Sequence, residues 1–259
     1  MSVLLGVFFM YISKAKLKDL AKYKQKKYRD EDDVFVAEGE KLVDDLLSYF
    51  VCRTLVVSER WKDVFQAKCP ILLATEDDLR RLSLQKSPQG VFAVFERSRR
   101  PQLFVPQTGL YLALDGVQDP GNLGTIIRLA DWFGVDGLVC SESCADAYNP
   151  KVVQSTMGAL SRVKFYEKVN LPQWLSKVSD FLPVYGTVLD GNNLYAEELN
   201  SNAVIVMGSE GNGISSEVMS TLSHRLFIPN YPLEKQTSES LNVAVATAIV
   251  CAEFRRRIE

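Results

Sequence analysis

Apolar residues recur along this chain at two spacings, one typical of buried strands and the other typical of amphipathic helices. Short apolar runs bounded by Gly, Pro or Asp predict strands, whereas apolar positions three and four residues apart predict helices. In the first third of the chain the runs predict strands at 34–37, 54–57, 71–74 and 89–95. The helical spacing predicts helices at 39–49, 61–67 and 76–84, and Thr75 is placed to cap the last of them.

From residue 110 onward, strand and helix patterns alternate more regularly. Strands are predicted at 110–114, 135–140, 162–166, 184–189, 203–207 and 225–228. Helices are predicted at 125–133, 149–159, 171–179, in a short segment from Ser215, and at 240–257. Such alternation is typical of a parallel sheet, which binds its ligands at the carboxyl ends of the strands.

These patterns predict an α/β chain with two domains of unequal size. A small α/β domain spans 13–97, and a larger domain with a parallel sheet spans 109–259. Residues 98–108 contain two prolines and are interpreted as a linker. Residues 1–12 are interpreted as an N-terminal tail, whose first nine residues are either disordered or an over-long start. The tail's apolar run is shorter than the roughly 20 residues that span a bilayer, and no basic residue precedes it, so we expect neither a membrane anchor nor a signal peptide.

Cysteine and histidine usage narrows the possible chemistry. The five cysteines are odd in number and scattered, without CxxC pairs, which favours a reducing, cytoplasmic setting over disulfides or structural zinc. There is one histidine, His224, so a His-rich metal site is excluded and no metal is expected.

A basic segment stands out in a chain whose net charge is −2. Residues 13–29 are predicted to form a helix capped by Ser13, with tyrosines between the charges and Asp19 as its one acidic residue. This segment is either a face that contacts RNA phosphates or a solvated amphipathic helix. The candidate RNA-binding residues are Lys14, Lys16, Lys22, Lys24, Lys26, Lys27 and Arg29.

Three turn-rich segments follow predicted strands of the larger domain, after Leu114, Met207 and Ile228. Because the strands are expected to be parallel, the three segments can converge on one ligand. The first contains GVQDPGNLG, which lacks the GxGxxG spacing of a dinucleotide site, and no GK dipeptide of a phosphate-binding loop occurs in the chain. In the second, Glu210 would repel an anion and therefore favours a cationic or hydroxyl-bearing ligand, unless it serves a helix N-terminus. Arg128, on a mostly apolar helix, either snorkels to solvent or contacts a ligand.

Three blocks of this sequence together resemble the SpoU/TrmH group of RNA ribose 2′-O-methyltransferases, in the SPOUT superfamily. They are DPGNLGTIIRLADWFG at 119–134, IVMGSEGNGIS at 205–215, and IPN with SESLNVAVATAI at 228–230 and 238–249. The small domain, with FVAEGEKLVDDLL at 35–47, resembles the substrate-binding domain of many members, which is akin to small RNA-binding ribosomal proteins. Residues 229–240 form a longer connection than is common in the family.

The resemblance implies a trefoil knot in the larger domain, bound S-adenosylmethionine, and a homodimer formed through the C-terminal domain. By motif match the catalytic positions are Asn122, Arg128, Glu210, Ser240 and Asn242. The implied cofactor-binding positions are Thr187, Met207, Gly208, Ser209, Gly211, Ile228, Pro229 and Leu241. The implied substrate is structured RNA, with ribosomal RNA preferred over transfer RNA.

The residue types suit the implied reaction, an in-line displacement from a sulfonium to a ribose hydroxyl. Asn122 can hold a hydroxyl or phosphate, and Arg128 can bind the target phosphate and stabilise a developing alkoxide, although a guanidinium is a demanding general base. Glu210 is expected to orient Arg128 or Asn122, and Ser240 to cap the last helix. The alternative is a catalytically idle RNA-binding or ribosome-assembly factor on the same scaffold.

Overall fold

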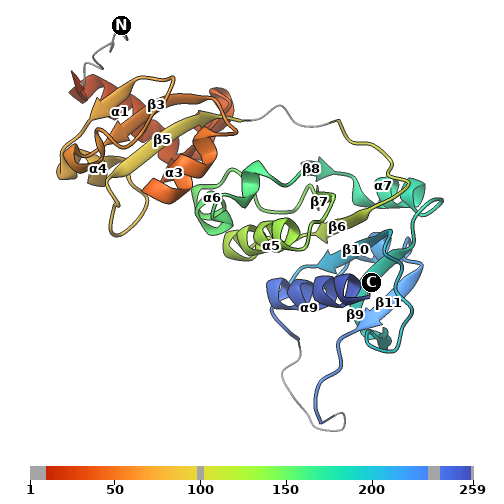
Figure 1. Cartoon of the computed structure of the whole chain (residues 1–259). Coiled ribbons are helices and arrows are strands. Elements are labelled where there is room, and N and C mark those ends of the chain that lie inside the picture. Colours follow the sequence, from red (N-terminus) through yellow and green to blue (C-terminus); the bar gives the residue numbers. More distant parts are fainter. Residues whose placement is uncertain (1–9, 98–101, 233–239, 258–259) are drawn as a thin grey trace, which may run out of the picture. The chain divides into compact units, whose positions relative to one another are not determined.

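The computed structural model of the chain describes residues 10–97, 102–232 and 240–257 (Figure 1). The residues outside the described ranges are 1–9, residues 98–101 of the predicted linker, residues 233–239 of the long connection, and 258–259. The described residues fall into two compact units. The first contains the chain up to Arg97 together with Tyr148–Gln154, and the second contains the remaining described residues from Gln102 onward.

The first unit is built on a mixed five-stranded sheet in the order β1-β4-β3-β5-β2. Its strands are β1 Met10–Tyr11, β2 Val34–Glu38, β3 Cys52–Val57, β4 Ile71–Leu73 and β5 Val91–Glu96. Its helices are α1 Lys14–Ala21, η1 Lys22–Lys24, α2 Lys26–Glu31, α3 Glu40–Leu47, η2 Glu59–Trp61 and α4 Glu76–Leu82. Met10 and Tyr11, placed in the tail by the sequence, pair in parallel with β4.

Both faces of this sheet are covered by helices, so β2 is buried at every position. Val34 and Val36 pack in one cluster with apolar residues of α1 and α4. Phe35, between them, stacks on Phe95 with 5.3 Å between ring centroids. The helix predicted at 61–67 is absent: only Phe65 of this segment is buried, and the short turn η2 reaches only its first residue, Trp61. A single buried residue provides too little apolar packing to hold an isolated helix.

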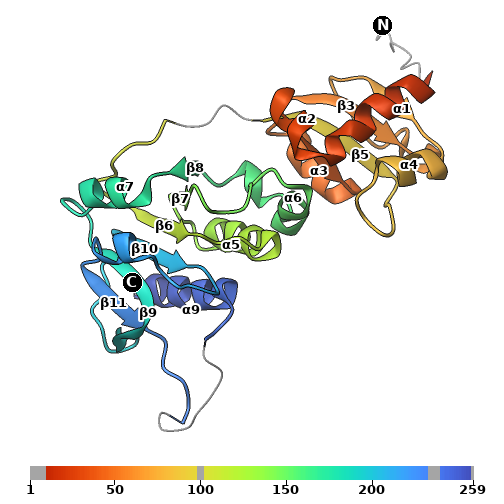
Figure 2. The ribbon, with the colours of Figure 1, turned by 180° about the vertical axis from the view of Figure 1, so that it is seen from behind.

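The second unit contains a six-stranded parallel sheet in the order β11-β9-β10-β6-β7-β8, which confirms the predicted parallel α/β domain (Figure 2). Its strands are β6 Leu110–Asp115, β7 Gly137–Ser141, β8 Phe165–Val169, β9 Val184–Asn193, β10 Ala203–Gly208 and β11 His224–Phe227. Its helical segments are α5 Pro120–Trp132, η3 Ala159–Ser161, α7 Leu171–Val178, α8 Ser216–Met219 and α9 Val243–Arg256, and α6 Pro150–Thr156 begins in the segment assigned to the first unit.

The central strands alternate their side chains between two helical layers. Ala113, Val204 and Val206 pack in one cluster with apolar residues of α7 and α8. Helices α5 and α9 pack side by side. The loop before α5 begins at the carboxyl end of β6, and the loop before α8 begins at the carboxyl end of β10. Within the described part of the chain, no helix combines the length and apolar character that crossing a membrane requires.

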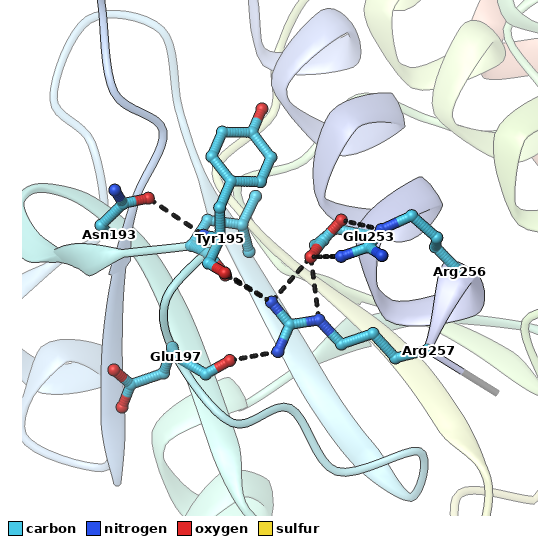
Figure 3. Close-up of polar contacts among 7 residues, drawn as sticks. Asn193, Tyr195, Glu197, Glu253, Arg256 and Arg257 are labelled. Atoms are coloured by element: carbon cyan, nitrogen blue, oxygen red, sulfur yellow. Dashed lines mark hydrogen bonds and ion pairs between the residues drawn. The ribbon is translucent and has the colours of Figure 1, made fainter.

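Arg257 ties the end of α9 to the segment that follows β9, and a buried carboxylate of α9, also bonded to Arg256, holds its guanidinium (Figure 3). Glu253 accepts hydrogen bonds from Arg256, at 2.7 and 2.8 Å, and from Arg257, at 2.8 Å. The Arg257 guanidinium also donates to the backbone carbonyls of Leu194, Tyr195 and Glu197. Glu253 is 6% exposed, so this anchor replaces the hydration that its carboxylate loses.

We expect this anchor to make stability depend on pH. Hydrogen bonds from Arg256 and Arg257 lower the pKa of Glu253 from 4.5 to about 2, against the opposing effect of burial. Because the pKa is depressed in the folded state, the stabilisation is complete above pH 4.5 and is lost as the pH falls towards 2. Glu253→Gln should lower the free energy of unfolding at pH 7 by about 1–3 kcal/mol and flatten its dependence on pH in that window. Urea unfolding from pH 2 to 7 measures both effects.

A matched control is Asp190→Asn, which removes an exposed ion pair with Arg225 of the same unit. Exposed pairs contribute about 0–1 kcal/mol, so this variant should keep the pH profile of the parent chain. Equal profiles for Glu253→Gln and Asp190→Asn would show that the buried carboxylate does not stabilise the fold.

Candidate active site

Side chains from three separate segments form a hydrogen-bonded chain at the carboxyl ends of the parallel strands. Asn122 donates from Nδ2 to Oε1 of Glu210. Asn242 donates from Nδ2 to Oδ1 of Asn122 over 3.0 Å. The three residues follow β6, β10 and β11 in the chain, so the predicted convergence of three loops is confirmed.

Asn122 is positioned by the first turn of α5. Asp119 is the N-cap, and its carboxylate accepts from the Asn122 backbone N–H over 2.8 Å. Pro120 occupies the first helical position, where its fixed φ fits and its missing N–H costs nothing. Helix α5 therefore begins five residues before the predicted start, and Gly121 and Gly124 lie inside it rather than in a glycine loop.

Glu210 lies on a tight loop between β10 and α8. Ser209 and Gly213 bond to each other's backbone at 2.9 and 3.0 Å, closing the loop at its base. Gly213 has a φ of +67°, in the left-handed region that favours glycine. The closure leaves the Glu210 side chain exposed apart from its contact with Asn122.

Asn242 serves both the fold and the candidate site. Its Oδ1 accepts from the backbone N–H groups of Ala244, at 3.0 Å, and Val245, at 3.3 Å, while its Nδ2 reaches Asn122. Asn242 is thus the N-cap of α9, and the prediction that Ser240 caps this helix is wrong. Ser240 and Leu241 lie before the helix and are exposed, and no hydrogen bond of Ser240 is found among the described residues.

Arg128 lies on the same helix as Asn122 but outside this chain of contacts. It is exposed, and no described residue accepts a hydrogen bond or ion pair from its guanidinium. Six residues along an α-helix correspond to about 9 Å of rise and roughly 120° of rotation. Of the two partners predicted for Glu210, Asn122 contacts its carboxylate, whereas no contact joins Glu210 to Arg128. The exposed guanidinium remains open to an external ligand.

The implied cofactor positions surround the same end of the sheet. Met207, at the end of β10, is buried, and its sulfur accepts from the Thr187 hydroxyl at 3.3 Å. Gly208 lies so close to the loop that a Cβ added there would sit 2.2 Å from the carbonyl carbon of Gly213. A Cβ added at Gly211 would meet nothing within 4 Å, so this part of the loop faces open space. Ile228 and Pro229 follow β11 and are half-buried.

The basic segment of the first unit is interrupted, unlike the single helix predicted from the sequence. Gln25 adopts an extended backbone, with φ −94° and ψ 134°, and separates η1 from α2. Lys22 is ion-paired with Asp32 at 2.8 Å and with Asp19 at 3.2 Å. Those carboxylates, Asp32 first, raise the pKa of Lys22.

Arg29 is a correction to the predicted RNA-binding set. Its side chain is 2% exposed and donates to the backbone carbonyls of Tyr23, at 3.0 Å, and Lys24, at 3.2 Å. These bonds hold the turn between α1 and α2, so Arg29 serves the fold. Lys14, Lys24 and Lys26 have no ion pair among the described residues, whereas Lys16 and Lys27 lie 3.6 and 3.8 Å from Asp19 and Glu31.

Asp115 makes a contact beside the candidate site that the sequence did not reveal. Its carboxylate, at the end of β6, accepts from the Ser215 backbone N–H at 2.7 Å. The sequence signal was an acid directly after an apolar strand, which is equally typical of a turn. No group of three or more residues able to hold a metal ion is found among the residues that the structure describes.

Comparisons with known proteins match both units. The model of the SpoU rRNA Methylase family matches residues 109–252, and the model of the MRM3-like substrate binding domain matches residues 14–93. The chain is 32% identical over 245 residues to the 23S rRNA (guanosine(2553)-2′-O)-methyltransferase RlmP of Bacillus subtilis, covering 93% of this chain and 96% of that protein.

Solved structures with the same fold include two that resemble the chain over nearly its whole length. A putative RNA methyltransferase of the TrmH family from Porphyromonas gingivalis is 42% identical, with a TM-score of 0.85, and the match covers 95% of this chain and 99% of that one. The AdoMet-bound rRNA methyltransferase from Sinorhizobium meliloti is 29% identical, with a TM-score of 0.83, and the match covers 96% and 97%.

Proposed function

Because the chain belongs to the SpoU rRNA methylase family, we propose that it methylates a ribose 2′-hydroxyl of ribosomal RNA with S-adenosylmethionine. The observation that carries this proposal is the contact chain of Asn122, Glu210 and Asn242 at the carboxyl ends of the parallel strands. RlmP, a 2′-O-methyltransferase of 23S rRNA, aligns with nearly the whole chain. Transfer RNA is the second candidate substrate.

The residues present fit a cationic, hydroxyl-bearing cofactor. The exposed Glu210 carboxylate is an acceptor for hydroxyls and attracts positive charge, and the backbone at Gly211 is open to close approach. S-adenosylmethionine supplies an electrophilic methyl group on a sulfonium. The proposed binding positions are Thr187, Met207, Gly208, Ser209, Gly211, Ile228, Pro229 and Leu241.

In the proposed mechanism, the chain's own groups position the RNA and stabilise charge. Each end of the Asn122 amide already has one partner, so it presents a fixed second N–H and a second lone pair to a ribose hydroxyl. Arg128 binds the phosphate beside the target ribose and stabilises negative charge on the attacking oxygen. We also propose that Ser240, in the segment before α9, contacts the RNA or the cofactor.

The test is calorimetric binding of S-adenosylmethionine to the full chain, followed by mapping of ribose methylation in ribosomal RNA incubated with both. We expect binding that a metal chelator does not change, and one methylated ribose. A catalytically idle RNA-binding or assembly factor would leave the RNA unmodified. The site does not favour that alternative, because the side chains of Asn122, Glu210 and Asn242 are all present and hydrogen-bonded to one another.

We further propose that residues 13–97 form the RNA-binding domain and that residues 98–108 link it to the methyltransferase domain at 109–259. Lys14, Lys24 and Lys26 are the strongest candidates for phosphate contacts, since no described acid neutralises them.

Replacing Lys14, Lys24 and Lys26 together with alanine should weaken RNA binding roughly tenfold or more at 0.1 M salt, because each lost phosphate contact lowers the salt slope by about 0.7–0.9. Fluorescence anisotropy at several salt concentrations measures affinity and slope. The matched control replaces Lys164 and Lys177, two exposed lysines of the second unit, and should change the slope less. An unchanged slope in the triple variant would identify the basic segment as a solvated face.

Oligomeric state, knot and location complete the proposal. We propose a homodimer through the C-terminal domain, which the resemblance to the SpoU/TrmH group implies. Trp132 at the end of α5 is 85% exposed, and a large exposed aromatic side chain of this kind supports an interface at that end of the helix. Sedimentation of the full chain as a monomer at micromolar concentration would contradict it.

The trefoil knot stays a prediction, and the five free thiols support a cytoplasmic location.

A further inference from the structure

The loop that carries Glu210 is tied at two points to the segment that runs from β6 into α5. One is the contact between Glu210 and Asn122 themselves. The other is the bond from the Ser215 backbone N–H to Oδ2 of Asp115, at 2.7 Å. Asp115 ends β6 and pairs in register with Gly208, so it lies beside the base of the loop.

The second tie fixes where the loop ends. The bonds between Ser209 and Gly213 close the loop internally, and the bond from the Asn212 N–H to the Ser209 hydroxyl, at 3.2 Å, also lies within it. Neither sets the orientation of the loop relative to β6. The Asp115 carboxylate does so, because it holds the residue at which the loop passes into α8.

We propose that Asp115 is a positioning residue that holds loop 209–215 so that Glu210 meets Asn122 and the loop backbone faces the cofactor. This rests on the proposed function for its chemistry, but the positioning itself is a property of the free protein. Asp115 touches neither RNA nor cofactor in this scheme; it acts through Glu210 and the loop.

Two variants remove the same hydrogen bond from opposite sides. Asp115→Ala deletes the acceptor. Ser215→Pro deletes the donor and leaves Asp115 in place, and the φ of Ser215, −64°, already matches that of proline. Asp115→Asn keeps an oxygen that can accept the bond and loses the charge, so it serves as the conservative rescue.

The chain offers a matched control at the other end of the same strand. Asp136 accepts from the Leu110 backbone N–H through Oδ2 at 2.9 Å, where β6 begins. Asp136→Ala therefore removes an equivalent carboxylate-to-backbone bond from the same strand, at the amino edge of the sheet and away from the loop. It reports the general cost of such a loss.

The first measurement is amide hydrogen exchange in the full chain without cofactor. We expect exchange across 209–215 to be at least tenfold faster in Asp115→Ala than in the parent chain, and unchanged there in Asp136→Ala. A tenfold change corresponds to about 1.4 kcal/mol, the scale of one hydrogen bond to a charged group. Ser215→Pro should accelerate exchange at 209–214 similarly, and Asp115→Asn by less than threefold.

The second measurement separates the two binding steps. In Asp115→Ala and Ser215→Pro, the Kd for S-adenosylmethionine should rise about tenfold, whereas the Kd for RNA stays within twofold. Asp115→Asn should restore most of the cofactor affinity, and Asp136→Ala should leave both constants unchanged. Should the parent chain bind no cofactor, the proposed function fails, and loop exchange still decides whether Asp115 positions the loop.

Unchanged loop exchange in both Asp115→Ala and Ser215→Pro overturns the inference. So does an equal loss of cofactor affinity in Asp136→Ala, because the effect would then be one of general stability. If Asp115→Ala fails to fold, Ser215→Pro and Asp115→Asn still give both readouts.

Discussion

Gly208→Ala is expected to abolish tight cofactor binding and to destabilise the second unit. A Cβ at this position would lie 2.2 Å from the Gly213 carbonyl carbon and 2.4 Å from the Ile214 nitrogen. Both are backbone atoms, so no side-chain rotation relieves the clash. The bridge between Ser209 and Gly213 must open instead, which moves Glu210 away from Asn122.

The expected size follows from overpacking, which costs about 1–3 kcal/mol and occasionally more. We expect the free energy of unfolding to fall by this amount and the Kd for S-adenosylmethionine to rise about a hundredfold, equivalent to about 2.7 kcal/mol. Urea unfolding and calorimetry measure the two quantities. RNA affinity, most of which we assign to the basic segment of the first unit, should change by less than twofold.

Gly211→Ala is the control for the stability part of this prediction. A Cβ there would meet nothing within 4 Å, so the free energy of unfolding should stay within about 0.5 kcal/mol of the parent value. If Gly208→Ala is as stable as Gly211→Ala, the loop has room that the structure does not show, and the close approach at Gly208 is not what shapes the site.

The convergence of the site was predictable because it follows from topology. Parallel strands place their carboxyl ends on one edge, so the segments after β6, β10 and β11 all begin at that edge. The apolar runs of β6 and β10 carried this information, since both strands are almost fully buried. The three motif blocks then indicated which side chains of those segments to examine.

The boundaries of the site helices were harder to predict, because capping competes with residue propensity. Gly121 and Gly124 are poor helix formers, yet the Asp119 cap and Pro120 start α5 before them. Asn242 outcompetes Ser240 as the cap of α9 because its side chain reaches two backbone N–H groups. Local sequence offered both serine and asparagine as acceptable caps, and only packing decides between them.

Charge was the least predictable property of the basic segment. Lys22 and Arg29 look like their neighbours in the sequence, but one pairs with Asp32 and the other is buried against backbone carbonyls. The Asp32 carboxylate becomes available to Lys22, and backbone carbonyls become available to Arg29, because the helix is interrupted at Gln25. No periodicity of residues 13–29 encodes that break.

Arg128→Ala should reduce methyl transfer far more than it reduces stability. The Arg128 side chain is exposed, and no described residue takes a hydrogen bond from its guanidinium. Its loss should therefore change the free energy of unfolding by no more than about 0.5 kcal/mol. If the guanidinium meets the target nucleotide, the single-turnover rate at saturating RNA should fall about 10²-fold or more, which is typical for removal of a group that stabilises developing charge.

Arg225→Ala is the matched control, because Arg225 is an exposed arginine of the same unit whose partner, Asp190, is a surface carboxylate. It should leave the single-turnover rate within twofold. The Kd for S-adenosylmethionine should stay unchanged in both variants, since Arg128 makes no contact with the cofactor loop among the described residues.

Arg128→Lys separates charge from shape. Lysine keeps the positive charge but lacks the planar fork that binds two phosphate oxygens at once. If simple charge attraction is sufficient, this variant should recover most of the rate. If Arg128 must hold the phosphate and the attacking oxygen in fixed positions, it should remain at least tenfold impaired, which is the outcome we expect. A near-parental rate in Arg128→Ala would instead show that this arginine only snorkels from α5, and the proposed charge stabilisation would have to come from another residue.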